Sequence, residues 1–220
     1  MKGKLIVIEG LDGSGKSTQI KLLSEKLKGR SIHQIKLPDY DSPSSSLVKM
    51  YLSGEFGNDP GDVNPYAASA FYAVDRYANY KTKWKQLYDK GVIIIADRYT
   101  PSNAYHQATK LEPADRPDFY KWLVEFEYEQ LGIPEPDAVI YLDMPIEISQ
   151  MMLTGRYGGD ETRKDIHEVN VDYLKKCREA ALEAAKALGW TVIECSADGQ
   201  PRSREDISED VYSAVKRELD

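Results

Sequence analysis

A glycine-rich segment near the N-terminus carries the clearest chemical signal in this 220-residue sequence. Residues 10–17 read GLDGSGKS and fit the pattern G-x-x-x-x-G-K-[ST]. In such a loop, backbone N–H groups point at phosphate oxygens, the lysine reaches the outer phosphates and the hydroxyl ligates Mg²⁺. A flexible glycine turn is the alternative. The segment predicts binding of a nucleoside triphosphate through Gly10, Asp12, Gly13, Ser14, Gly15, Lys16, Ser17 and Thr18.

A second candidate site follows an apolar run in the middle of the chain. Residues 92–99 read VIIIADRY, which predicts a buried strand ending in Asp97 and Arg98. Strands of an open α/β sheet deliver their carboxyl-terminal residues to a ligand crevice. Asp97 could hold metal-bound water there, and Arg98 could hold a phosphate. The alternative is an ion pair that merely ends a strand.

Regular secondary structure must hold the phosphate loop and the Asp97–Arg98 pair in place. Short apolar segments alternate with longer amphipathic segments along the chain. This alternation predicts a parallel sheet covered on both faces, in a single domain over residues 1–220. The expected strands are Leu5–Ile8, Ile32–Leu37, Val92–Ala96, Ala138–Leu142 and Thr191–Glu194. The expected helices span residues 16–28, 47–52, 65–89, 118–131, 145–154, 169–188 and 207–219.

Composition excludes several classes of function. Lys and Arg total 29 against 36 Asp and Glu, a formal charge of −7, which argues against binding nucleic acid or a membrane surface. No segment approaches the roughly 20 apolar residues of a membrane span, and the N-terminus lacks the pattern of a signal peptide. Cys177 and Cys195 form no paired motif. We expect a soluble, cytoplasmic protein.

Five segments together resemble the thymidylate kinases, within the nucleoside monophosphate kinases. They are EGLDGSGKSTQ at 9–19, LPD at 37–39, AVDR at 73–76, DRYTPSNA at 97–104 and PDAVIYLD at 136–143. The resemblance implies a three-layer α/β/α P-loop NTPase fold with a central five-stranded parallel sheet and a mobile lid. It also implies a homodimer that uses ATP and Mg²⁺ to phosphorylate dTMP to dTDP by direct in-line transfer, a step of dTTP biosynthesis. A kinase for another nucleoside monophosphate or a deoxynucleoside, or a nucleotide-dependent switch or binding protein, is the alternative.

The resemblance assigns roles to matching residues. Asp12 is expected to receive the sugar 3′-hydroxyl of the acceptor, and Arg76 and Arg98 to grip its monophosphate. Asn103 is expected to hydrogen-bond the pyrimidine edge, and Tyr72 occupies the place of a stacking phenylalanine. For Tyr72, a core aromatic on a helix face is the alternative.

One position departs from the family pattern. His106, with Tyr105 beside it, stands where the family usually has an aromatic residue that blocks a ribose 2′-hydroxyl. This departure affects the expected discrimination between deoxyribose and ribose. A purely structural histidine is the alternative.

A glycine-hinged, charged segment supplies the expected lid at about residues 155–165, where 155–164 read GRYGGDETRK. In the resembling family an arginine sits either in the phosphate loop or in the lid, and here the loop position is Gly13. A closing lid would therefore bring Arg156 or Arg163 to the transferred phosphoryl group; a solvated surface loop is the alternative. The expected catalytic residues are Asp12, Lys16, Arg98, Arg156 and Arg163, and the expected metal ligands are Ser17 and Asp97.

Overall fold

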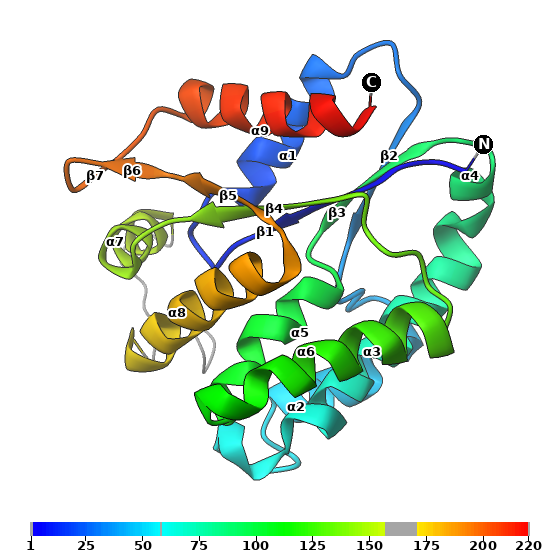
Figure 1. Cartoon of the computed structure of the whole chain (residues 1–220), viewed down its shortest axis with the longest axis vertical. Helices are drawn as coiled ribbons and strands as arrows, with labels where there is room; N and C mark the ends of the chain where they lie inside the picture. Colours follow the sequence, from blue (N-terminus) through cyan, green and yellow to red (C-terminus); the bar gives the residue numbers. More distant parts are fainter. Residues whose placement is uncertain (1, 58, 157–170, 220) are drawn as a thin grey trace.

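A five-stranded parallel sheet forms the centre of the protein, with strand order β2-β3-β1-β4-β5 (Figure 1). The structure is a computed structural model that describes residues 2–57, 59–156 and 171–219. The strands are β1 (Leu5–Glu9), β2 (Ile32–Lys36), β3 (Ile93–Asp97), β4 (Ala138–Asp143) and β5 (Thr191–Glu194). The five strands predicted from the apolar runs are all present, with ends that differ by one residue at most.

Strand register places the two predicted motifs side by side. β1 lies between β3 and β4, and every residue of β1 and β3 is buried, as expected for strands covered on both faces. Ile8 pairs with Asp97, and Glu9 pairs with Tyr141. Because parallel strands end at the same edge of a sheet, the phosphate loop after β1 and Arg98 after β3 leave the sheet together.

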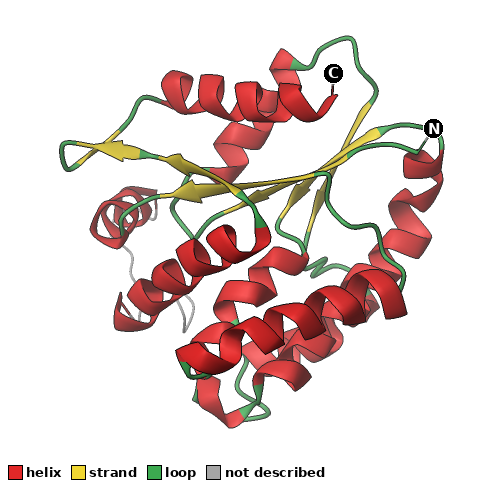
Figure 2. Ribbon diagram, viewed as in Figure 1, coloured by secondary structure: helices red, strands yellow, loops and turns green. Residues whose placement is uncertain are grey.

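Helices cover both faces, so the predicted three-layer α/β/α architecture is confirmed (Figure 2). On one face, α1 (Lys16–Lys26) and α9 (Arg204–Leu219) pack on a core that includes Ile6, Ile8 and Ile95. Leu5, Val7 and Ile94 point to the opposite face, in a second core with Trp84 and Tyr99. The remaining helices are α2 (Ser46–Leu52), α3 (Pro65–Asn79), α4 (Lys85–Asp89), α5 (Thr100–His106), α6 (Arg116–Val124), α7 (Ile146–Arg156) and α8 (Val171–Leu188).

Two of the long predicted helices each include a π-helical segment, in which the turns are wider than in an α-helix. Residues 65–89 run as α3, a π-helical segment Tyr80–Trp84 and α4. Asn64 caps the start, because its side chain accepts a hydrogen bond from Ala67 N at 2.9 Å. Likewise α6 continues into a π-helical segment, Glu125–Gln130. Such segments often mark functional sites, and the second one carries a residue of the site described below.

Helix α5 was not predicted. Its sequence, TPSNAYH, is short and lacks a clear 3.6-residue apolar period, and only Pro101 in the first turn hints at a helix start. Four short 3₁₀ turns and a β-hairpin complete the described chain: Pro43–Ser45, Pro60–Asp62, Ala108–Lys110, Pro113–Asp115, and β6 (Ser196–Ala197) with β7 (Gln200–Pro201). No described helix combines the length and the apolar character needed to cross a lipid bilayer.

Candidate functional site

A cavity of about 230 Å³ opens at the carboxyl edge of the sheet, where ligands bind in open α/β folds. Its walls come from the loop after β1, the ends of β2 and β3, and helices α2, α3, α5 and α8. The residues that the sequence assigns to an acceptor all line it: Asp12, Tyr72, Arg76, Arg98, Asn103 and His106. The fold therefore gathers into one pocket residues that lie up to 94 positions apart (106 − 12).

The phosphate loop connects β1 to α1 in the conformation that its glycines permit. Gly15 has φ 93° and forms the N-terminal cap of α1, so the helix N-terminus faces the loop, which suits an anion. Gly13 has φ 81°, and a Cβ added there would lie only 2.7 Å from Ser149 O of α7. An arginine at this loop position would therefore require α7 to move.

The Lys16 side chain turns back toward the phosphate loop. Its Nζ donates to Gly10 O at 2.8 Å and to Leu11 O at 3.1 Å, and the residue is only 7% exposed. Burial, together with the nearby charge of Arg98, lowers the pKa of Lys16 to about 8, although Asp12 opposes the shift. A phosphate bound in the loop would oppose this lowering of the pKa, because its negative charge favours the protonated amine of Lys16.

Three hydroxyls accompany the lysine in the loop and the first turn of α1. Ser14 Oγ is buried and has no hydrogen-bond partner among the described residues, whereas Ser17 is exposed and Thr18 partly so. An unsatisfied buried hydroxyl is costly. The loop therefore offers a polar group that a bound ligand can satisfy.

Asp12 and Arg98 connect the phosphate loop to the cavity. Arg98 Nη2 donates to Asp12 Oδ1 at 2.8 Å. Burial alone would raise the pKa of Asp12, but the charges of Arg98 and Lys16 outweigh it and hold that pKa below its usual range. Arg98 has φ 69°, a left-handed conformation that costs a non-glycine residue about 1–3 kcal/mol and often marks a functional site.

Glu9, at the end of β1, stabilises this strained junction. Its fully buried carboxylate accepts hydrogen bonds from Tyr99 N at 2.9 Å, Ser102 Oγ at 2.8 Å and Tyr105 Oη at 2.9 Å. Burial raises the pKa of Glu9, and the charge of Arg98 and these donors oppose the rise. Sequence reasoning missed Glu9, although a carboxylate that ends an entirely apolar strand is a signal that could have found it.

Arg76 is held by a second buried carboxylate that sequence reasoning missed. Its Nε and Nη2 donate to the two oxygens of Glu127 at 2.6 and 2.5 Å, and Thr100 Oγ1 donates to Glu127 at 2.9 Å. Burial would lower the pKa of Arg76, but Glu127 outweighs it and raises that pKa. Glu127 balances the charge of Arg76. Arg76 therefore contributes hydrogen-bond donors to the cavity but little net positive charge.

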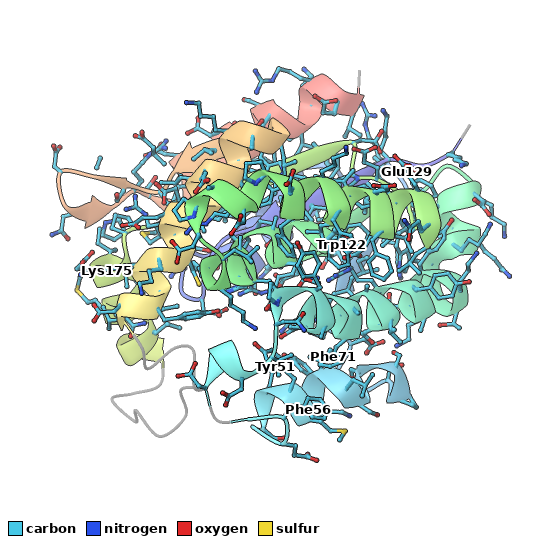
Figure 3. The ribbon with its side chains drawn as sticks, turned by 60° about the horizontal axis from the view of Figure 1, so that its bottom comes forward. Tyr51, Phe56, Phe71, Trp122, Glu129 and Lys175 are labelled. Atoms are coloured by element: carbon cyan, nitrogen blue, oxygen red, sulfur yellow. The ribbon has the colours of Figure 1, made fainter. Side chains whose placement is uncertain are left out.

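Tyr72 and Asn103 form a less polar part of the cavity wall. Tyr72 is half-buried and meets Tyr51 edge-on, with ring centroids 6.4 Å apart. Tyr51, Phe56 and Phe71 pack α2 and the turn after it against α3 and support this wall (Figure 3). Asn103 is buried, and its Nδ2 donates to Ser69 O at 3.3 Å. Tyr72 is thus a cavity residue rather than only a core aromatic.

His106 lines the cavity beside Arg98. Its Nε2 lies 3.4 Å from Arg98 Nη1, and its Nδ1 lies 3.6 Å from Cys177 Sγ. A guanidinium can only donate, so a hydrogen bond from Arg98 requires a lone pair on Nε2 and a proton on Nδ1. The structure thus places His106 in the cavity wall, in contact with Arg98.

The expected metal ligands and lid arginines differ in what the structure describes. Asp97 is 9% exposed at the end of β3, and its carboxylate accepts no hydrogen bond from any described residue. Within the described part of the chain, no group of three or more His, Cys, Asp or Glu forms a metal site. Arg163, most of the predicted lid and the side chain of Arg156 lie outside the described residues.

Comparisons with known proteins identify the family of this chain. Residues 8–207 match the family model described as thymidylate kinase. The chain is 30% identical to a probable thymidylate kinase of Pyrobaculum aerophilum over 213 residues, covering 96% of each chain. It is 31% identical to a thymidylate kinase of Mycobacterium tuberculosis, covering 84% of this chain and 87% of the relative.

A solved structure supports the fold. The chain superposes on a thymidylate kinase of Candida albicans with a TM-score of 0.72 and 23% identity, covering 99% of this chain and 93% of that one. The family model alone covers most of the sequence and includes the phosphate loop, the cavity residues and β4. The chain therefore belongs to the thymidylate kinase family.

Proposed function

We propose that this kinase binds ATP at the phosphate loop and dTMP in the neighbouring cavity, and that the phosphoryl group crosses at Asp12 and Arg98. Membership of the family makes the protein an ATP-dependent kinase of dTMP. One observation carries the site assignment: the 2.8 Å contact between Arg98 in the cavity wall and Asp12 in the loop. The acceptor site and the donor site thus share a boundary.

The reaction needs positioning and positive charge more than a nucleophilic side chain. An oxygen of the acceptor phosphate attacks the γ-phosphorus in line, and the charge of the loose transition state is spread over its equatorial oxygens. Lys16 and Arg98 stabilise that charge from the two sides of the boundary. Asp12 receives the sugar hydroxyl; its side chain is 41% exposed and so can exchange Arg98 for that partner.

The base and the phosphate of dTMP fit different parts of the cavity. Tyr72 provides a stacking face, and Asn103 provides an amide for the pyrimidine edge. Of the two arginines, Arg98 is the main phosphate ligand, since Glu127 already balances Arg76. Arg76 then supplies hydrogen-bond donors to the acceptor from the part of its guanidinium that Glu127 does not engage.

Magnesium fits the residues assigned to it. Mg²⁺ prefers oxygen ligands, and it commonly takes only one or two from the protein together with substrate phosphates and water. The exposed Ser17 hydroxyl and the Asp97 carboxylate, which no described donor engages, provide such oxygens. They would hold the ion, which neutralises phosphate charge when bound.

A lid arginine, Arg156 or Arg163, supplies further charge in the transition state. The support is steric: α7 approaches Gly13 too closely for a side chain at that loop position. The lid belongs to the same single domain as the rest of residues 1–220.

The protein forms a homodimer in the cytoplasm. Helix α3 supports the dimer, because it exposes the large apolar residues Val74 and Tyr77, which lie one turn apart. Burying such a stripe against a second copy would remove it from water.

An acceptor survey tests this function. ADP release, coupled to a visible signal, is measured with each natural nucleoside monophosphate and with thymidine, at fixed ATP and Mg²⁺. We expect the highest kcat/KM with dTMP, and no release from thymidine, which lacks the attacking phosphate. The Lys16→Ala variant controls for contaminating kinases. Preference for another monophosphate, or equal ADP release without acceptor, would contradict the assignment.

ATP affinity is expected to fall as pH rises above about 8. The pKa of Lys16 is lowered to about 8 in the free protein, and a triphosphate favours the charged amine. Binding above this pH therefore takes up a proton, which weakens affinity by up to about tenfold per pH unit. Calorimetric titrations between about pH 7 and pH 10 measure the effect.

The matched control is Lys16→Arg, because a guanidinium stays charged over this pH range. In this variant the break in the profile near pH 8 should disappear, whatever the absolute affinity. A wild-type dissociation constant that stays flat across the range would show that Lys16 does not titrate there.

A further inference from the structure

Tyr105 connects the phosphate-loop strand to Arg98 through a buried hydroxyl. The residue is fully buried on α5, and its ring meets Tyr141 of β4 edge-on at 5.9 Å. Its hydroxyl lies 2.9 Å from Glu9 Oε2 and 3.0 Å from Arg98 Nη1. Tyr105 is not among the described residues that line the cavity, so it meets Arg98 from behind the site.

The direction of these hydrogen bonds follows from their chemistry. A guanidinium only donates, so the Tyr105 oxygen accepts from Arg98. The hydroxyl proton must then point to an acceptor, and the Glu9 carboxylate is the nearest one. A relay therefore runs from Arg98 through Tyr105 to Glu9, and the carboxylate at its end favours the tyrosine orientation that receives Arg98.

Glu9 also fixes the backbone that carries Arg98. Arg98 itself has the left-handed φ of 69°, its N–H donates to Ile8 O at 3.3 Å, and the next N–H, of Tyr99, donates to Glu9 Oε1 at 2.9 Å. The same carboxylate thus restrains the main chain through Tyr99 and the side chain through Tyr105.

The other contacts of the Arg98 guanidinium are less permanent. Asp12 is 41% exposed at its side chain and is assigned to the acceptor sugar, so its contact is given up during binding. His106 Nε2 is 3.4 Å away, at the long end of hydrogen-bond distance. Among the described partners, the Tyr105 hydroxyl is the one that is both close and fully buried.

We propose that Tyr105, oriented by Glu9, is a positioning residue that holds the Arg98 guanidinium in place to receive the acceptor phosphate. The inference rests on the proposed function, in which Arg98 binds that phosphate. Tyr105 itself touches no substrate and acts only through Arg98.

The test removes the hydroxyl alone, with Tyr105→Phe. We expect the dissociation constant for dTMP to rise about tenfold, the effect of losing one hydrogen bond to a charged group. Affinity for thymidine, which has the same base and sugar but no phosphate, should stay unchanged. The control is Tyr120→Phe, because the Tyr120 hydroxyl is buried on α6 without a described hydrogen-bond partner. It should alter neither affinity, and melting temperatures confirm that each variant folds.

A double-mutant cycle with Arg98→Ala separates the proposal from its premise. We expect Arg98→Ala to weaken dTMP binding strongly, and Tyr105→Phe to add nothing in that background. If Tyr105→Phe weakens dTMP and thymidine alike, or acts equally with and without Arg98, it only shapes the pocket and the proposal fails. The proposal alone fails if Arg98→Ala has a large effect and Tyr105→Phe has none. If Arg98→Ala itself leaves dTMP affinity unchanged, the phosphate role of Arg98 is wrong and the proposal falls with it.

Discussion

Replacing Lys16 by alanine is expected to abolish phosphoryl transfer while leaving the fold intact. The amine is the cation of the phosphate loop, and losing one preorganised donor to a developing charge costs a rate factor on the order of 10²–10³. The loop itself keeps its backbone hydrogen bonds, such as Ser14 N to Leu11 O at 3.1 Å. The measurement is kcat with dTMP and saturating ATP.

Stability gives an independent check on the same variant. Burial lowers the pKa of Lys16 from 10.5 to about 8, so the charged amine costs the folded state free energy at neutral pH. Removing it should leave the melting temperature of the free protein unchanged or raise it. Lys16→Met, which keeps the apolar stem, is the matched control and should be equally inactive. A variant that keeps more than about a tenth of the wild-type kcat would rule out this role for the lysine.

Among the predicted variants, those that break the Arg76–Glu127 ion pair are expected to lose the most free energy of unfolding. Both side chains are almost fully buried, at 3% and 0% exposed, and they share two hydrogen bonds of 2.6 and 2.5 Å. Removing one partner leaves the other as an uncompensated buried charge, which costs about 3–5 kcal/mol. Urea unfolding of Arg76→Ala and Glu127→Ala, with unchanged m-values, measures this cost.

A paired replacement distinguishes the ion pair from simple packing. Arg76→Met with Glu127→Leu removes both charges and keeps apolar volume, so it should recover most of the free energy of unfolding. The double variant should nevertheless bind dTMP more weakly than the wild type does, because it lacks the hydrogen-bond donors of Arg76. A loss below about 1 kcal/mol in either alanine variant would show that the charges are not buried together.

This pair also illustrates what the sequence can and cannot predict. Arg76 was identifiable because it stands in a recognisable local motif, but Glu127 lies 51 residues further along and carries no local signal. Glu127 lies in the π-helical segment Glu125–Gln130, and its contact with Arg76 depends on how this segment packs against α3 in the tertiary structure. Conversely, the phosphate loop was predictable in detail, since strand, glycines and helix start all lie within a few neighbouring residues.

The same reasoning explains the missed helix and the missed relay. Helix α5 is built by burial between α6 and α8 rather than by a periodic apolar pattern in its seven residues. Sequence reasoning placed Tyr105 only beside His106, because the hydroxyl contacts that link it to Glu9 exist only after β1 and β3 pair. The residues that line the cavity were thus easier to predict than the buried residues that hydrogen-bond to them.

The contact between Gly13 and α7 also constrains how such an enzyme can evolve. Any Cβ at position 13 would lie 2.7 Å from Ser149 O and 3.0 Å from Leu153 Cγ. A descendant of this sequence therefore cannot move a catalytic arginine into the loop by one substitution, because the helix must first be displaced. Under the proposed lid mechanism, a change of helix packing, and not one substitution alone, therefore separates an arginine in the lid from an arginine in the phosphate loop.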